Sequence, residues 1–145
     1  MARIAALVPD LLFGSRVQAA LEQAGHEVDL LGSEPEAWDE VGGIDVLVVD
    51  LTTDVLDGAA LVETLKMGGE LHGVRTLGFF AHVHPEVRER ALRAGFDQVV
   101  PRSRMAREGA ELVERLVSSS GDRERRSGQA APPPGARDDR GPQNP

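Results

Sequence analysis

Apolar and polar residues form two kinds of pattern along the chain. Short unbroken apolar runs, such as IDVLVVD at 44–50, are typical of parallel strands buried on both faces. Longer segments with apolar residues three or four positions apart, such as 104–119, are typical of amphipathic helices. The pattern predicts strands at 3–8, 26–31, 44–50, 74–81 and 96–100. It predicts helices from 12 to a C-cap at Gly25, at 57–69, 84–95 and 104–119, and a brief helix within 33–43.

These strands and helices alternate along the chain. Alternation with short connections favours a parallel sheet with helices on both faces, joined by right-handed crossovers. Five such strand–helix units fit the flavodoxin-like strand order 2-1-3-4-5. The sequence therefore predicts one α/β domain over residues 1–119, with a five-stranded parallel sheet.

The last part of the chain, 120–145, has a different composition. It is rich in Pro and Gly, carries mixed charge and has almost no large apolar residue. Such a segment buries too little surface to offset the entropy lost on ordering. We predict a disordered tail, and we expect no folded output domain after residue 120.

Composition excludes several classes of function. The 145 residues include no Cys, so disulfides and thiolate metal sites are absent. The net charge is −8, and because the tail holds five Arg and four acidic residues, the acidic excess lies in the folded part. An acidic body argues against binding to nucleic acid or to an anionic membrane. No apolar run is long enough to span a bilayer and no signal peptide is recognisable, so we expect a cytoplasmic protein.

Polar residues follow several of the predicted strands. Ligands of open α/β sheets bind at the carboxyl ends of the strands, near the point where the strand order reverses. The chain places Asp10 after the first strand, Asp50 and Thr52 at the third, Ala81 at the fourth and Arg102 after the fifth. We expect these residues to line one pocket, in which an Asp beside the Arg stays ionised.

Three stretches in order resemble the receiver domain of bacterial two-component response regulators, over residues 3–118. DLTTDVLDG, with Gly58 eight residues after Asp50, resembles the stretch around the phospho-accepting Asp. LEQAGHEV resembles the end of the first receiver helix and the start of the second strand. RERALRAGFDQVVPRS resembles the fourth helix and fifth strand, and it places Arg102 where receivers have a lysine. The resemblance implies that Asp50 occupies the phospho-acceptor position.

The chain departs from this family at the residues that support the acceptor. A receiver holds Mg²⁺ with a pair of acids after the first strand, but here the apolar pair at 8–9 stands there and Asp10 comes one place later. A receiver also has Ser or Thr at the end of the fourth strand, where this chain has Phe80 or Ala81. Asp10 and Asp50 are therefore the candidate metal ligands, and we expect no cofactor other than a poorly held Mg²⁺ if Asp50 is phosphorylated.

These departures favour a degenerate receiver, or pseudo-receiver, that acts as a signalling and protein-interaction module and not as an enzyme. We expect Asp50 to form an ion pair with Arg102. The family's output surface implies a protein partner, a histidine kinase or an output protein, bound at the face formed by 84–95, 96–100 and 104–119.

Two alternatives stay open at this point. The first is a single-domain response regulator in which Asp50 accepts a phosphoryl group in a phosphorelay. The second is a flavodoxin-like domain that binds a metal or small molecule, for which His82 and His84 have the spacing to present two imidazoles beside Asp10 or Asp50. For this His pair we favour a polar loop over a metal site.

Overall fold

The computed structural model describes residues 1–81 and 85–130, with side chains described up to residue 119. Its five strands form one parallel sheet in the order β2-β1-β3-β4-β5. The strands are β1 (Arg3–Leu7), β2 (Glu27–Leu31), β3 (Val46–Asp50), β4 (Arg75–Phe80) and β5 (Gln98–Pro101). The helices are α1 (Leu11–Gln23), α2 (Glu34–Glu40), α3 (Gly58–Met67), α4 (Pro85–Ala94) and α5 (Arg102–Ala130), with a 3-10 helix η1 (Val41–Gly43). Every predicted strand and helix is present, and the predicted strand order is confirmed.

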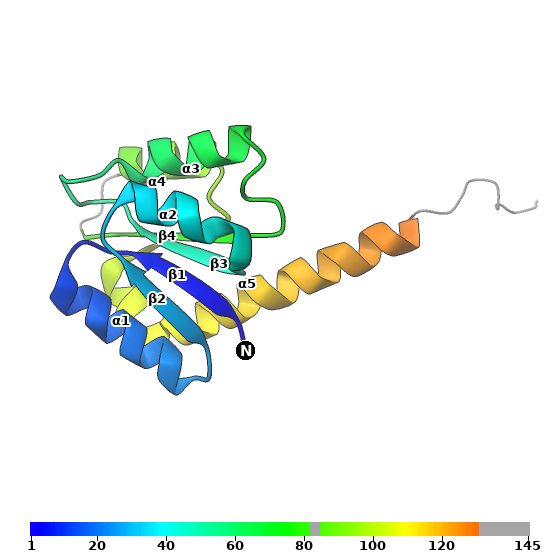
Figure 1. Cartoon of the computed structure of the whole chain (residues 1–145), viewed down its shortest axis with the longest axis horizontal. Helices are drawn as coiled ribbons and strands as arrows, with labels where there is room; N and C mark the ends of the chain where they lie inside the picture. The colour runs from blue at the N-terminus through cyan, green and yellow to red at the C-terminus, as the bar shows by residue number, and fades with distance from the viewer. Residues whose placement is uncertain (82–84, 131–145) are drawn as a thin grey trace, which may run out of the picture.

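Helices cover both faces of the sheet: α1 and α5 lie on one side, and α2, α3 and α4 lie on the other (Figure 1). The central strand β3 shows how its residues divide between the two layers. Val46 and Val48 pack in the core beneath α1 and α5, whereas Leu47 and Val49 pack in the opposite core. Because side chains alternate along a strand, Asp50 is directed toward the α1–α5 layer.

The α1–α5 layer is held by the apolar stripes that the sequence predicts. Val17 and Leu21 of α1 and Leu112 and Leu116 of α5 are buried against the sheet, together with Met105. Burying a Leu or Met side chain contributes roughly 1.5–3 kcal/mol. This packing fixes the first turns of both helices beside the carboxyl ends of the strands.

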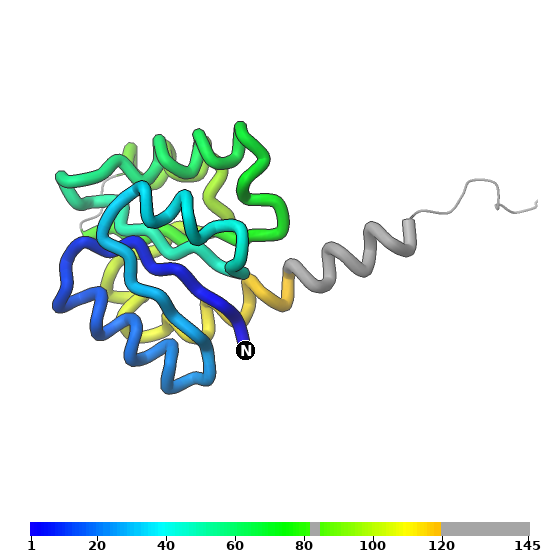
Figure 2. Tube along the Cα trace, in the orientation of Figure 1, coloured from blue at the N-terminus to red at the C-terminus, as the bar shows by residue number. Residues whose placement is uncertain are grey.

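The predicted helix stop at Gly25 is confirmed, and α4 ends in the same way. Gly25 has φ of +97° and Gly95 has φ of +113°, in the left-handed region that costs other L-residues roughly 1–2 kcal/mol. The tube in Figure 2 shows the chain turning sharply after α1 to enter the edge strand β2. These stops keep the connections short enough to align all five strands.

Helix α5 is longer than the sequence predicts. It begins at Arg102 and continues to Ala130, whereas the predicted helix ends at 119 and a disordered tail was expected from 120. The next proline in the sequence is Pro132, so no proline interrupts the described helix. The rest of the tail, 131–145, lies outside the described residues, so its disorder stays a prediction.

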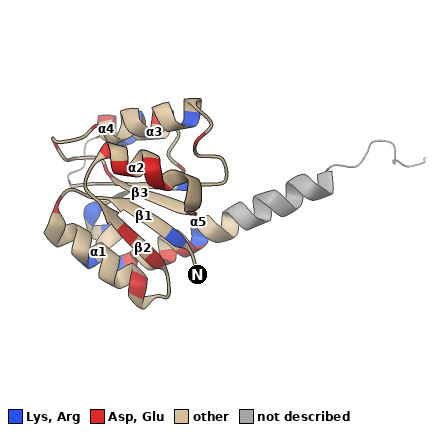
Figure 3. Cartoon of the chain, viewed as in Figure 1, with Lys and Arg blue, Asp and Glu red and all other residues tan. Residues whose placement is uncertain are grey.

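Acidic and basic residues are distributed over helices and strands of the domain (Figure 3). Acidic residues gather on β2 and α2, and they are Glu27, Asp29, Glu34, Glu36, Asp39 and Glu40. Among the described residues, no helix is both long and apolar enough to cross a bilayer.

Candidate functional site

Asp50 is the last residue of the central strand β3, and only 4% of it is exposed. It pairs in register with Phe79 of β4, and the next residue, Leu51, donates its N–H to the carbonyl of Phe79 at 2.8 Å. Asp50 therefore lies at the carboxyl edge of the sheet, where the resemblance to receivers places the acceptor.

The Asp50 carboxylate is held by a local turn. Its Oδ1 accepts hydrogen bonds from the backbone N–H of Thr52 at 2.9 Å and from the Thr52 hydroxyl at 3.1 Å. The Thr52 Oγ1 in turn accepts the backbone N–H of Ala81 at 3.2 Å. Thr52 thus ties the end of β3 to the end of β4, and it brings the predicted pocket residues Asp50, Thr52 and Ala81 together. Within the described part of the chain, Asp50 Oδ2 accepts no hydrogen bond and Asp50 forms no ion pair.

Asp10 is engaged twice. Its Oδ1 caps α1 by accepting the backbone N–H groups of Leu12 at 3.1 Å and Phe13 at 3.2 Å. Its Oδ2 accepts a hydrogen bond from Arg102 Nη2 at 2.9 Å. The bond from Arg102, and next the backbone bond from Phe13, hold the pKa of Asp10 below its ordinary value. Asp10 is consequently an ionised helix cap with a fixed cationic partner.

The predicted ion pair between Asp50 and Arg102 is wrong, because Arg102 pairs with Asp10. Arg102 is the first residue of α5 and lies next to the start of α1, since these two helices share one face of the sheet. Its guanidinium carbon lies 4.0 Å from the centre of the Phe13 ring, a cation–π contact. The Phe13 ring packs on Phe79 with 5.2 Å between centroids, which connects the pair to the core.

Neither candidate at the end of β4 supplies a hydroxyl. Phe80 is 4% exposed and packs in the core on the α3–α4 side. Ala81 is exposed and contributes its backbone N–H to Thr52. The hydroxyl of Thr76 lies at the start of β4, at the opposite edge, where it bonds Asp97.

Gly58 has a packing role that the spacing alone does not reveal. A Cβ at Gly58 would lie 2.5 Å from Val49 Cγ1 and 3.4 Å from the carbonyl oxygen of Asp50. The glycine therefore lets α3 begin directly against the end of β3. Asp57 is the N-cap of α3, because its side chain accepts the N–H of Ala60 at 3.0 Å.

The sequence did not identify two contributors to this edge. The first is Phe13, whose ring contacts the Arg102 guanidinium. The sequence feature that could have indicated it is an aromatic residue in the first turn of the helix that Asp10 caps. Arg90 of α4 pairs with Asp57 at 2.8 Å and joins α4 to the start of α3. A pairing between residues 33 positions apart has no local signal.

The predicted metal ligands stay a prediction. Within the residues that the structure describes, no group of three or more His, Asp or Glu side chains is arranged to hold a metal ion. The His82 and His84 pair lies outside these residues.

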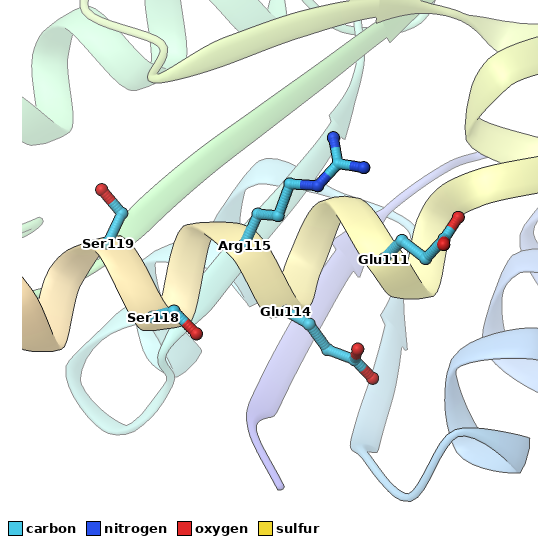
Figure 4. Close-up of a pocket in the computed structure, with 5 residues that line it drawn as sticks. All are labelled: Glu111, Glu114, Arg115, Ser118 and Ser119. Atoms are coloured by element: carbon cyan, nitrogen blue, oxygen red, sulfur yellow. The ribbon is translucent and has the colours of Figure 1, made fainter.

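A cavity of about 460 Å³ lies along α5 (Figure 4), and Asp50 is not among its lining residues. It is lined by Glu111, Glu114, Arg115, Ser118 and Ser119. Glu111 follows Arg102 by nine residues, which corresponds to about 14 Å along a helix. Its lining comes from one helix and mixes both charges, so it defines no ligand class.

Solved structures of similar fold include receiver domains of response regulators. The Francisella response regulator 1452 receiver domain has a TM-score of 0.73 at 18% identity, covering 83% of this chain and 99% of that one. A CheY-like receiver domain protein from Methanospirillum hungatei has a TM-score of 0.73 at 17% identity, covering 85% and 98%. The receiver domain of the putative response regulator NarL from Mycobacterium tuberculosis has a TM-score of 0.68 at 21% identity, covering 81% and 96%.

These similarities show the fold. The chain has the flavodoxin-like fold of response regulator receiver domains, with five parallel strands in the order 2-1-3-4-5. No family model and no curated protein matches the sequence. The predicted fold class is confirmed.

Proposed function

We propose that this chain is a receiver-like signalling and protein-interaction module whose phospho-acceptor site is degenerate. One observation carries the proposal: Arg102, which stands where receivers have a lysine, is paired with the helix cap Asp10 and not with Asp50. The carboxylate at the acceptor position is instead held by its own turn through Thr52.

Phosphoryl transfer needs positioning and neutralisation of the charge that arrives with the phosphoryl group. Among the described residues, Asp50 has only hydroxyl and backbone donors, both on Oδ1, and β4 ends in Phe80, which Ala81 follows. A phosphoryl group on Asp50 would meet no hydroxyl at the end of β4. The usual receiver readout of phosphorylation is therefore not built into this chain.

Intact mass spectrometry tests the proposal directly. The protein is incubated with Mg²⁺ and acetyl phosphate, and a labile phosphate adduct is sought. We expect no adduct in the wild-type chain. An adduct that is lost in Asp50→Asn but kept in Asp54→Asn, a nearby exposed acid, would contradict the proposal.

The second candidate is a working phospho-acceptor, and one observation favours it. Oδ2 of Asp50 accepts no hydrogen bond among the described residues, so a nucleophilic oxygen is left at the strand end. The same mass measurement decides between the two candidates, because only a working acceptor forms the Asp50-dependent adduct.

The partner belongs to the proposal as well. We infer a protein partner, a histidine kinase or an output protein, that binds the face of α4, β5 and α5. The 39% exposed Leu92 supports this choice, since it gives α4 an apolar contact on its surface. Binding to purified kinases and output proteins should weaken in Leu92→Asp and not in Met67→Asp, which lies on α3; equal loss in both would dismiss this face.

A further inference from the structure

The acceptor edge contains a cation that is part of the protein. Arg102 is held by two contacts: its Nη2 donates to Asp10 Oδ2 at 2.9 Å, and its guanidinium stacks on the Phe13 ring at 4.0 Å. The Phe13 ring in turn packs on Phe79. The Arg102 side chain is 34% exposed, so the guanidinium lies at the rim of the edge. The ion pair with Asp10 and the contact with Phe13 restrict the Arg102 side chain to this position.

This edge offers few free oxygen ligands to a divalent cation. Mg²⁺ requires near-octahedral oxygen coordination and usually binds through one or two carboxylates. Both oxygens of Asp10 already accept hydrogen bonds, from α1 and from Arg102, and Oδ1 of Asp50 accepts two from Thr52. The oxygen donors described here do not fit the Mg²⁺ ion that the fold family implies.

The direction of the strands places the acceptor and this cation on the same side of the sheet. Asp50 continues the register of Val46 and Val48, which face the α1–α5 layer. Arg102 and Asp10 begin the two helices of that layer. A metal ion held between Asp10 and Asp50 would therefore compete with the guanidinium for the same carboxylate and would meet its positive charge.

We propose that the guanidinium of Arg102 takes the place of the divalent metal at this edge, so that no divalent metal ion binds between Asp10 and Asp50. The proposal concerns the cation and goes beyond the proposed function, since it holds whether or not Asp50 accepts a phosphoryl group. Arg stays charged throughout the physiological pH range, and the edge is consequently insensitive to metal supply.

Manganese binding to the full chain tests this proposal. Mn²⁺ replaces Mg²⁺ at oxygen sites and is followed by electron paramagnetic resonance or water proton relaxation. We expect no saturable Mn²⁺ site in the wild type across the millimolar range. In Arg102→Met, which removes the charge and frees Asp10, we expect saturable binding with a Kd at least about tenfold below the highest Mn²⁺ concentration at which the wild type shows no site.

Two control variants test whether the positive charge at position 102, and not the shape of arginine or a charge elsewhere on α5, excludes the metal. Arg102→Lys keeps a positive charge and should stay without a saturable site. Arg104→Met removes a neighbouring guanidinium that pairs with Glu108 at 3.2 Å, and it should behave as the wild type. Binding gained in Arg102→Met should disappear when Asp10→Asn or Asp50→Asn is added.

Two results would overturn the proposal. One is a saturable Mn²⁺ site in the wild type that is lost in Asp10→Asn or Asp50→Asn, a result that needs no arginine variant to fold. The other is a folded Arg102→Met protein, checked by circular dichroism, that binds Mn²⁺ no better than the wild type. An Asp50 adduct that forms equally with EDTA would contradict the proposed function but leave this inference intact.

Discussion

Asp57 has two separable tasks at the start of α3. Its Oδ1 caps the helix through the N–H of Ala60, and its Oδ2 pairs with Arg90 of α4 at 2.8 Å. The hydrogen bond from Arg90 is the largest cause that lowers the pKa of Asp57 below its ordinary value. Both side chains are about half exposed, at 51% and 53%, so solvent screens the pair and its contribution is small.

The lowered pKa of Asp57 determines how this ion pair changes the stability of the protein with pH. Because its pKa is lower in the folded than in the unfolded chain, the pair stabilises the protein above the unfolded pKa, 3.8, and this stability is lost as pH falls through the folded pKa. Asp57→Asn keeps a good N-cap and removes only the charge. We expect it to lower the free energy of unfolding by up to about 1 kcal/mol at neutral pH, with a smaller difference near about pH 3.

Urea denaturation at the two pH values measures this difference. Asp57→Ala is the matched variant, since it also removes the cap and should cost about 1 kcal/mol more. If the difference in free energy of unfolding between wild type and Asp57→Asn grew as the pH fell, the pKa of Asp57 would not be lowered by folding.

The position of Asp50 could be predicted from sequence, but the partner of Arg102 could not. An apolar run that ends in a carboxylate, with Gly58 eight residues later, is a local signal that needs no tertiary information. The Asp10–Arg102 pair joins residues 92 positions apart. It depends on which helices share a face of the sheet and on the length of one side chain. Sequence patterns place a charged residue at an edge, and packing then selects its partner.

At the scale of elements, the junction between β3 and α3 controls how closely a helix approaches the acceptor strand. A Cβ at Gly58 would meet Val49 Cγ1 at 2.5 Å and Leu51 Cδ2 at 3.3 Å. Val49 and Leu51 flank Asp50 in the chain. The absence of a side chain at Gly58 thus sets the packing of the two residues on either side of the acceptor.

Gly58→Ala should destabilise the protein. Overpacking costs about 1–3 kcal/mol, whereas the gain in helix propensity is at most about 1 kcal/mol, so the loss outweighs the gain. Thermal and urea unfolding measure the change. Gly42→Ala is the control, because nothing lies within 4 Å of a Cβ there, and we expect a change within about 0.5 kcal/mol. If Gly58→Ala and wild type had the same free energy of unfolding, α3 would be able to move away from β3 without loss of stability, and the expected overpacking would be absent.

The elements were predictable because several signals agreed in each. The strands are continuous apolar runs, and the helices combine apolar stripes with Asp57 as cap and with Gly25 or Gly95 as stop. The far end of α5 was missed because composition was the only guide there. Mixed charge argues against a packed core, but it does not prevent helical backbone before Pro132.

At the scale of the whole molecule, the two cores depend unequally on the last helix. One core packs beneath α2, α3 and α4, and the other is closed by α1 and α5. Leu112, Val113 and Leu116 supply the buried face of α5 and are at most 6% exposed. Removing this face would leave α1 as the only described helix on that side of the sheet.

Truncation tests where the domain ends. A chain of residues 1–119 keeps this buried face of α5, and we expect it to unfold cooperatively with a midpoint close to that of the full chain. A chain of residues 1–110 loses Leu112, Val113 and Leu116. Since one Leu→Ala change in a core costs about 2–5 kcal/mol and a domain is stable by only about 5–15 kcal/mol, the shorter chain should not fold. Circular dichroism and calorimetry measure the folding of both truncated chains, and Leu112→Ala in the full chain should be folded but less stable than the wild type.

If 1–119 lost cooperative unfolding, the folded domain would include residues beyond 119, and the predicted boundary would have to move toward the end of α5.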